Sequence, residues 1–308
     1  MPWSQTAGSQ DRRVRAWRGR WSCSFHIPAV SSDDKPMNLR NPDLIDIGAN
    51  LTHDSFDQDR AEVVRRAADA GVRRMIVTGA SMASTRQAIE LATESAGQLF
   101  ATAGVHPHHA TELTETAARE LHELVREPVV VAAGECGLDY FRDFCPRDAQ
   151  RHAFELQLDI AIQARKPLFL HQRDAHDDFV SILRPRLEEL HGGVAHCFTA
   201  GKRELKEYLD MGLYIGITGW ICDERRGQAL REAVSCLPLD RVLLETDAPY
   251  LLPRDLPFKA AARRNEPAFL PHIAEVAAQY MGCTFEQLAR AATANTERLF
   301  RLPETGPD

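Results

Sequence analysis

Four residues of types that bind divalent metals each follow a short apolar run. They are two carboxylates and two imidazoles, namely Glu135, His171, His196 and Asp247. Carboxylate oxygens and imidazole nitrogens together form the sites at which metalloenzymes polarise a substrate and activate water. The set therefore indicates a metal centre built for hydrolysis.

The spacing of these residues indicates how they could meet. Positions 135, 171, 196 and 247 are separated by 36, 25 and 51 residues, and one strand-plus-helix unit takes roughly 30 residues. The first two gaps fit one unit each and the third fits two. Buried parallel strands read as continuous apolar runs, and in a β/α barrel the carboxyl ends of the strands share one rim. The spacing therefore predicts that all four side chains converge on that rim.

An alternation of strand and helix patterns begins at Leu44 and supplies the elements that this rim requires. We predict strands over 44–47, 75–78, 99–103, 129–133, 168–170, 194–195, 213–217 and 242–244. Amphipathic helices are predicted between them, over 60–70, 85–95, 117–126, 148–165, 177–190 and 202–210. Further helices are expected over 267–302, with Pro271 near the start of one and Thr284 as an N-cap. The pattern favours a closed (β/α)8 TIM-type barrel, with an open doubly wound sheet as the runner-up.

The first 40 residues differ from the rest of the chain. Five arginines between Arg12 and Arg20 cluster there with Trp17 and Trp21, and no long apolar core marks a secretory signal. We interpret residues 1–40 as a disordered extension or an upstream start-site artefact, with the natural start near Met37. Residues 41–308 are then expected to form a single barrel domain.

Composition narrows the class of protein. The chain has 308 residues, of which 44% are hydrophobic and 26% charged, as in ordinary globular proteins. Its net charge of −7 argues against a broad surface that coats duplex nucleic acid, but it allows an enzyme that takes one strand end into a pocket. No apolar run reaches the roughly 18–20 residues of a membrane span. Seven cysteines without a C-x-x-C pair fit reduced thiols, so we predict a cytoplasmic protein. We also expect it to be a monomer and to make no contact with a membrane.

Other residues near predicted strand ends could contact a substrate. His106 and His108 follow the third strand, and His106, the nearer, could contact a phosphate or a leaving group. Arg173 follows His171 by two residues and could clamp a phosphate. Trp220 follows the seventh strand and could stack on a base. The plainer alternatives are loop histidines, a surface salt bridge and an aromatic ring that simply packs.

These motifs resemble those of the TatD family of metal-dependent deoxyribonucleases, within the amidohydrolase-like barrels. The likeness runs from about Leu44 to Leu302, over segments 46–52, 104–108, 134–139, 171–175, 196–199, 245–254 and 263–267. The resemblance implies a TIM-type barrel and a magnesium-dependent 3′→5′ exonuclease acting on single-stranded DNA and RNA, with DNA repair as a candidate role. It also implies metal ligands at Glu135, His171, His196 and Asp247.

One departure bears on the metal. Many amidohydrolase-like enzymes place a His-x-His pair on the first strand, whereas this chain has Gly48 and Asn50 at those positions. Loss of two imidazoles weakens one cation position, which favours a hard, partly hydrated Mg²⁺ ion over tightly held Zn²⁺, with Mn²⁺ as a further alternative. One or two cations are therefore expected. Asn50 would hydrogen-bond water or the substrate.

These observations lead to a specific hypothesis, namely hydrolysis of a phosphodiester bond at the 3′ end of a strand. The catalytic residues are predicted to be Glu135, Asp247 and His106, with Asp247 positioning or deprotonating the attacking water. Substrate contacts are predicted for a second set, Asn50, His108, Arg173 and Trp220.

Two alternatives remain open at this point. The first is a metal-dependent amidase or lactonase on the same barrel, which the missing His-x-His pair disfavours. The second is a non-catalytic barrel that binds a partner protein, which the intact ligand set disfavours.

Overall fold

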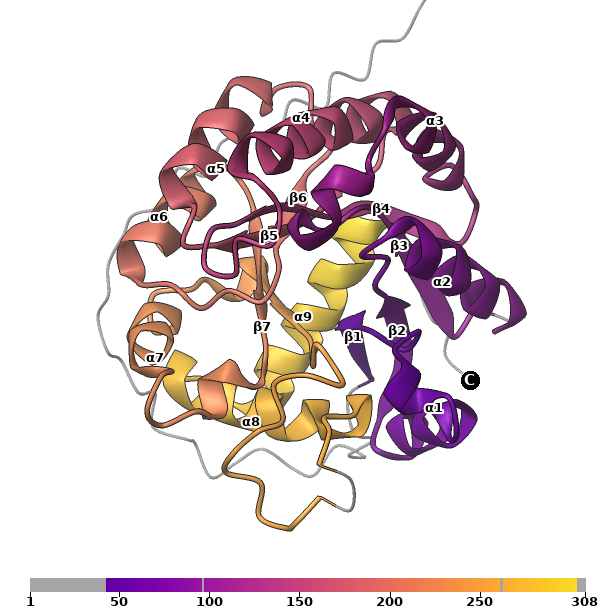
Figure 1. The fold of residues 1–308 in the computed structure, drawn as a ribbon. Coiled ribbons are helices and arrows are strands. Elements are labelled where there is room, and N and C mark those ends of the chain that lie inside the picture. The colour runs from indigo at the N-terminus through magenta and orange to yellow at the C-terminus, as the bar shows by residue number, and fades with distance from the viewer. Residues whose placement is uncertain (1–42, 96, 261–262, 304–308) are drawn as a thin grey trace, which may run out of the picture.

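The computed structural model describes residues 43–95, 97–260 and 263–303. Within these ranges eight parallel strands form one sheet in chain order. The strands are β1 Leu44–Ala49, β2 Val72–Val77, β3 Leu99–Ala103, β4 Val130–Asp139, β5 Leu168–Arg173, β6 Gly193–Ala195, β7 Tyr214–Ile217 and β8 Val242–Leu244. The helices are α1 Arg60–Asp69, α2 Met82–Glu94, α3 Glu115–Leu124, α4 Arg147–Ala164, α5 His176–Leu183, α6 Lys202–Asp210, α7 Gln228–Val234, α8 Leu270–Met281 and α9 Phe285–Phe300. Figure 1 shows most helices arranged around the strands, with α9 crossing the middle of the view.

The sheet closes on itself where the segment after β8 meets the end of β1. Ala49 forms a parallel bridge with Ala248. The Asn50 amide donates to the Ala248 carbonyl at 2.7 Å, and the Asp247 amide donates to the Gly48 carbonyl at 2.8 Å. This closure confirms the predicted (β/α)8 barrel over the open sheet. It also fixes Asn50 and Asp247 beside each other on the carboxyl-terminal rim.

The opposite end of the barrel is covered by α9. Asn295 donates from Nδ2 to the carbonyls of Leu239 and Val242, and Thr293 donates from Oγ1 to the Asp43 carbonyl. Val242 begins β8, Leu239 lies in the turn before it, and Asp43 directly precedes β1. Leu299 and Phe300 pack against interior strand residues such as Ile47, Phe169 and Leu243. With its amino-terminal end plugged by apolar side chains, the barrel leaves the carboxyl-terminal rim for chemistry.

Several predicted boundaries were wrong in informative ways. The fourth strand does not end at residue 133; β4 continues to Asp139, so that Glu135 lies inside it. Likewise β5 continues through His171 to Arg173. The helix predicted over 177–190 ends at Leu183, because Pro185 lacks an amide proton and its ring obstructs a further helical turn. Residues Arg184–Arg186 form a 3-10 turn instead.

The capping signals near the end of the chain were confirmed. Pro271 lies in the first turn of α8, where its missing amide proton costs nothing. Thr284 caps α9, and Gln287 completes the capping box. The predicted N-terminal extension lies outside the described residues. None of the helices in the described ranges combines the length and apolar character needed to cross a bilayer.

Candidate metal centre

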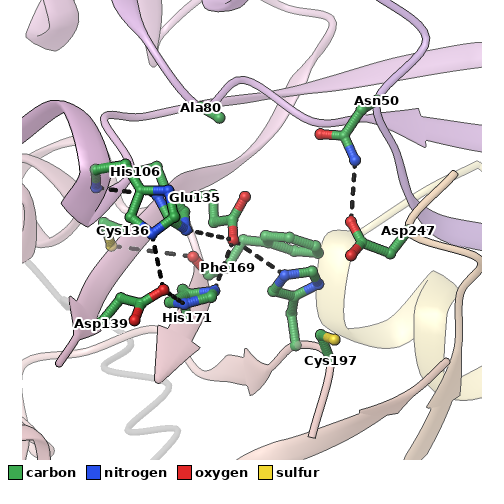
Figure 2. Close-up of polar contacts among 12 residues, drawn as sticks. Asn50, Ala80, His106, Glu135, Cys136, Asp139, Phe169, His171, Cys197 and Asp247 are labelled. Atoms are coloured by element: carbon green, nitrogen blue, oxygen red, sulfur yellow. Dashed lines mark hydrogen bonds and ion pairs between the residues drawn. The ribbon is translucent and has the colours of Figure 1, made fainter. Parts of the chain in front are cut away.

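Glu135 lies among three imidazoles on the carboxyl-terminal rim. Its Oε1 atom is 3.0 Å from His171 Nδ1, 3.0 Å from His196 Nε2 and 3.5 Å from His106 Nε2. Figure 2 shows the side chains of His106 and His171 directed toward this carboxylate. These residues come from β4, β5 and the segments after β3 and β6. The structure thus brings together three of the four predicted metal ligands and adds His106 to them.

A second carboxylate, Asp139, lies beside the first group. Its Oδ2 atom is 2.8 Å from His108 Nε2 and 3.4 Å from His171 Nε2. Asp139 is buried, and it accepts hydrogen bonds from the backbone amides of Phe141 and Arg142. His171 therefore lies between two carboxylates, with one ring nitrogen facing each.

Asp247 faces the cluster from another part of the rim. Asn50 donates a hydrogen bond from Nδ2 to Asp247 Oδ1 at 2.9 Å. Figure 2 shows Asn50 and Asp247 on one side of the site and His106, Glu135 and Asp139 on the other. The pairing places Asn50 in direct contact with a predicted ligand.

Glu245 holds His196 in place from behind. Its Oε2 atom is 2.9 Å from His196 Nδ1, and its Oε1 atom accepts a hydrogen bond from the Cys197 amide. Glu245 is fully buried between two glycines. A Cβ atom at Gly48 would lie 2.6 Å from Glu245 Oε2, and one at Gly216 would lie 2.4 Å from Oε1. The space that a side chain at position 48 would occupy is therefore filled by Glu245.

The electrostatics of the centre follow from burial and close charges. Burial alone would raise the pKa of Glu135, but the imidazoles of His106 and His196, which carry positive charge in acid, hold that pKa well below its usual value. Burial lowers the pKa of His106 well below its ordinary value, so that its ring is neutral at neutral pH. For His196, burial also acts to lower the pKa, but the carboxylates of Glu245 and Glu135 raise it well above the ordinary value. Burial raises the pKa of Asp247 to about 7.

Two buried glutamines of α4 position the backbone around the centre. Gln157 accepts a hydrogen bond from the Val105 amide at 2.7 Å and donates to the Val105 carbonyl at 2.9 Å, which fixes the residue before His106. Gln150 accepts a hydrogen bond from the Asp139 amide at 2.9 Å. Because each glutamine lies on the buried face of one helix, α4 couples the segment after β3 to the end of β4.

The donor set fits a divalent cation. Ligand atoms of His106, Glu135 and His171 all lie within 4.8 Å of one another, and so do those of His106, His108 and Asp139. His171 Nε2 is buried and makes no hydrogen bond among the described residues, although Asp139 Oδ2 lies 3.4 Å away. A buried group of several carboxylates needs positive charge nearby, which a cation provides. His196 joins the first group through its 3.0 Å contact with Glu135.

Comparison with known proteins identifies the family. A family model described as TatD related DNase matches residues 45–301. The chain belongs to this family.

Curated relatives match the TatD-related chain over most of its length. A protein from Erwinia billingiae named 3′-5′ ssDNA/RNA exonuclease TatD is 51% identical over 260 residues, covering 84% of this chain and 100% of the relative. A protein of the same name from Klebsiella pneumoniae is 49% identical, covering 85% of this chain and 100% of the relative.

Solved structures agree with this family assignment. A TatD homolog from Escherichia coli K12 superposes with a TM-score of 0.78 at 27% identity, covering 85% of this chain and 99% of that one. A TatD family hydrolase from Entamoeba histolytica gives a TM-score of 0.75 at 26% identity, covering 83% and 97%. The predicted resemblance is confirmed, and with it the nuclease class of enzyme and its dependence on metal.

Two residues of the TatD-related centre were missed by sequence reasoning, Asp139 and Glu245. Both lie in segments that carry the family resemblance, 134–139 and 245–254, but neither was assigned a role from the sequence. A signal was available, because side chains two positions apart in a strand point to the same face. Asp139 lies four positions after Glu135 in β4 and so shares its face, whereas β8 ends at Leu244 and gives no such signal for Glu245.

The predicted substrate contacts lie at different places on the rim. Asn50 contacts Asp247, and His108 Nε2 is occupied by Asp139. Arg173 and Trp220 lie beside one another, with the guanidinium 5.6 Å from the centre of the indole ring. Both line a cavity that also reaches His196.

Proposed function

We propose that this chain is a metal-dependent 3′→5′ exonuclease that hydrolyses phosphodiester bonds of single-stranded DNA and RNA. The observation that carries the proposal is the buried Glu135 carboxylate within 3.0–3.5 Å of three imidazoles, in a chain of the TatD-related DNase family. The names of relatives about half identical to it supply the polarity and the substrate.

Glu135, His171 and His196 would hold the cation, with Asp247 as a further ligand. A bound divalent ion supplies Lewis acidity at the scissile phosphate and makes water more acidic. We propose Mg²⁺, with Mn²⁺ and Zn²⁺ as alternatives, because the first strand contributes no imidazole. The neighbouring Asp139 carboxylate would serve a second cation, so that the centre holds one or two.

Asp247 and His106 would handle the reacting groups. Asp247, oriented by the hydrogen bond from Asn50, would position the attacking water and accept its proton. His106 has a neutral ring because burial lowers its pKa, and it would contact the phosphate or the leaving oxygen. His108 is engaged by Asp139, so we assign it to orienting that carboxylate rather than to the substrate.

The test is digestion of single-stranded DNA and RNA carrying a 5′ label, with Mg²⁺, Mn²⁺ and Zn²⁺ in turn. We expect products that shorten from the 3′ end, and no cleavage in EDTA. Glu135→Ala should lose nearly all of this activity, while Glu232→Ala on the exposed face of α7 serves as the control. Unchanged cleavage by Glu135→Ala would overturn the proposal, and shortening from the 5′ end would overturn the polarity. A role in DNA repair stays a prediction.

The amidase or lactonase alternative is disfavoured by the packing around Gly48. An imidazole at that position could enter the site only if Glu245 moved, because a Cβ atom there would already lie 2.6 Å from Glu245 Oε2. Small amides and esters assayed beside the oligonucleotides test this alternative directly, since their rapid hydrolysis would favour it.

A further inference from the structure

Arg173 is held by two aromatic rings and has no anionic partner among the described residues. Its guanidinium carbon is 4.1 Å from the centre of the Phe141 ring and 5.6 Å from that of Trp220. In the part of the chain that the structure describes, its guanidinium makes no hydrogen bond or ion pair. Stacking of this kind fixes the plane of a guanidinium but leaves its N–H edge available to an anion. Arg173 is therefore a preorganised cation two residues beyond His171.

A cavity of about 690 Å³ adjoins this arginine. This volume lies within the range of about 300–1,000 Å³ that is usual for ligand sites. The cavity reaches from His196, whose side chain is 3% exposed, to Arg203 and Asp177, whose side chains are 72% and 90% exposed. The cavity thus runs from one predicted metal ligand, His196, to open solvent. We call it the Arg173 cavity.

The other arginines of the Arg173 cavity are already paired within the described residues. Arg203 lies 3.2 Å from Asp177, and Arg226 lies 2.8 Å from Asp223. Arg147 lies 3.3 Å from Asp143.

Most carboxylates that line the Arg173 cavity also have hydrogen-bond or ion-pair partners. Asp178 accepts from the Tyr140 hydroxyl at 2.7 Å, and Glu204 accepts from the Gly201 amide at 3.2 Å. Asp174 is exposed, where water and salt screen its charge. Arg173 is therefore the arginine of this cavity whose charge is not balanced by a carboxylate of the described residues, and an incoming anion would bind there.

We propose that Arg173 binds the internucleotide phosphate on the 5′ side of the scissile one, and that Phe141 stacks on a base of that part of the strand. The inference rests on the proposed 3′→5′ exonuclease function. An exonuclease must let the uncleaved body of the strand extend out of the site while the terminal nucleotide is at the metal centre. Because the Arg173 cavity is open to solvent at its outer end, it can hold this uncleaved part of the strand.

Phe141 offers the stacking surface. Its ring is 53% exposed although it covers Arg173. Exposed aromatic rings beside a cationic group are the usual means of binding single strands without reading their sequence. An arginine stacked on that ring can at the same time donate to a phosphate oxygen, so that one nucleotide is held at both its base and its phosphate.

The experiment compares two substrates that differ by one phosphate. The dinucleotide d(TpT) has only the scissile phosphodiester, and d(TpTpT) adds the neighbour on its 5′ side. We expect Arg173→Gln to lower kcat/KM for d(TpTpT) about tenfold more than for d(TpT), mainly through KM. Phe141→Ala should lower kcat/KM for d(TpTpT) about fivefold or more. Arg203→Gln, which removes a paired arginine from the same cavity, is the matched control and should change the ratio less than about twofold.

Each outcome decides the inference. Equal losses of kcat/KM on both substrates in Arg173→Gln would overturn it. An effect of Arg203→Gln as large as that of Arg173→Gln would also overturn it, because net charge alone would then explain the data. If Arg173→Gln proves unfolded by circular dichroism, Arg173→Lys replaces it, since lysine keeps the charge but loses the planar fork. A wild-type protein that cleaves neither substrate with any metal contradicts the proposed function itself. Cleavage by wild type, with a d(TpTpT) to d(TpT) ratio unaffected by these substitutions, contradicts only the present inference.

Discussion

The metal centre and the Arg173 cavity share one rim but are built in opposite ways. In the centre, Glu135 and His196 are buried, and His196 lies within 3.0 Å of both Glu135 and Glu245. In the cavity, Phe141 is half exposed and Arg173 is held by rings rather than by a carboxylate. Bond cleavage needs fixed, desolvated groups, whereas a strand of any sequence needs an open surface that tolerates different bases. The rim meets these two demands at separate places, the buried cluster around Glu135 and the open cavity around Arg173.

The largest expected effect separates the two regions outright. Glu135→Gln should lower kcat at least about 100-fold, because a neutral amide cannot hold or balance a cation as the carboxylate does. Binding of a fluorescein-labelled oligonucleotide in EDTA, measured by anisotropy, should change less than about threefold, since the Arg173 cavity is left intact. A parallel loss of binding would show that the two regions are not separable.

A smaller effect is expected from the carboxylate behind His196. Glu245→Gln should weaken metal binding about 10–100-fold, because Glu245 fixes the orientation of the His196 ring. Calorimetric titration with Mn²⁺ measures the loss, and activity should recover at high metal concentration. Glu232→Gln on α7 is the control. A kcat deficit that persists at saturating metal would contradict a positioning role for Glu245.

Salt should act on the cavity and spare the centre. KM for d(TpTpT) should rise with NaCl concentration while kcat stays nearly constant, because phosphate contacts by arginine are weakened by salt. In Arg173→Gln the slope of log KM against log salt should fall by about 0.7, the value for one lost contact to a single strand. Identical slopes in both proteins would remove Arg173 from the phosphate contacts.

The smallest effect concerns the scaffold of the cavity. Burial would raise the pKa of Asp223, but hydrogen bonds from Arg226 and the charge of Arg254 hold it below its ordinary value of 3.8. A lowered carboxyl pKa contributes stability above the unfolded value, and that stability is lost as pH falls through the folded pKa. Asp223→Asn should therefore lower Tm by about 2–4 °C at neutral pH, and the gap to wild type should narrow as pH falls below the ordinary pKa of 3.8. A gap that widens in acid would contradict this sign.

The barrel and most of its metal centre could be predicted from the sequence. The barrel followed from apolar runs separated by helical patterns, and Glu135, His171 and His196 followed from residue type at strand ends. Pro185 also marks the end of α5 in the sequence, although the helix predicted over 177–190 extends beyond it. These properties are local, because strand length, helix period and proline geometry each depend on a few neighbouring residues.

Only the tertiary structure decided which side chains meet. It carried β4 four residues past Glu135, so that Asp139 reached His171, and it packed Glu245 into the space left by Gly48 and Gly216. It also set Arg173 between Phe141 and Trp220, which come from different loops. Such pairings depend on the register between neighbouring strands and on the closure of the barrel. Both are fixed by the packing of the whole sheet, which no short stretch of sequence encodes.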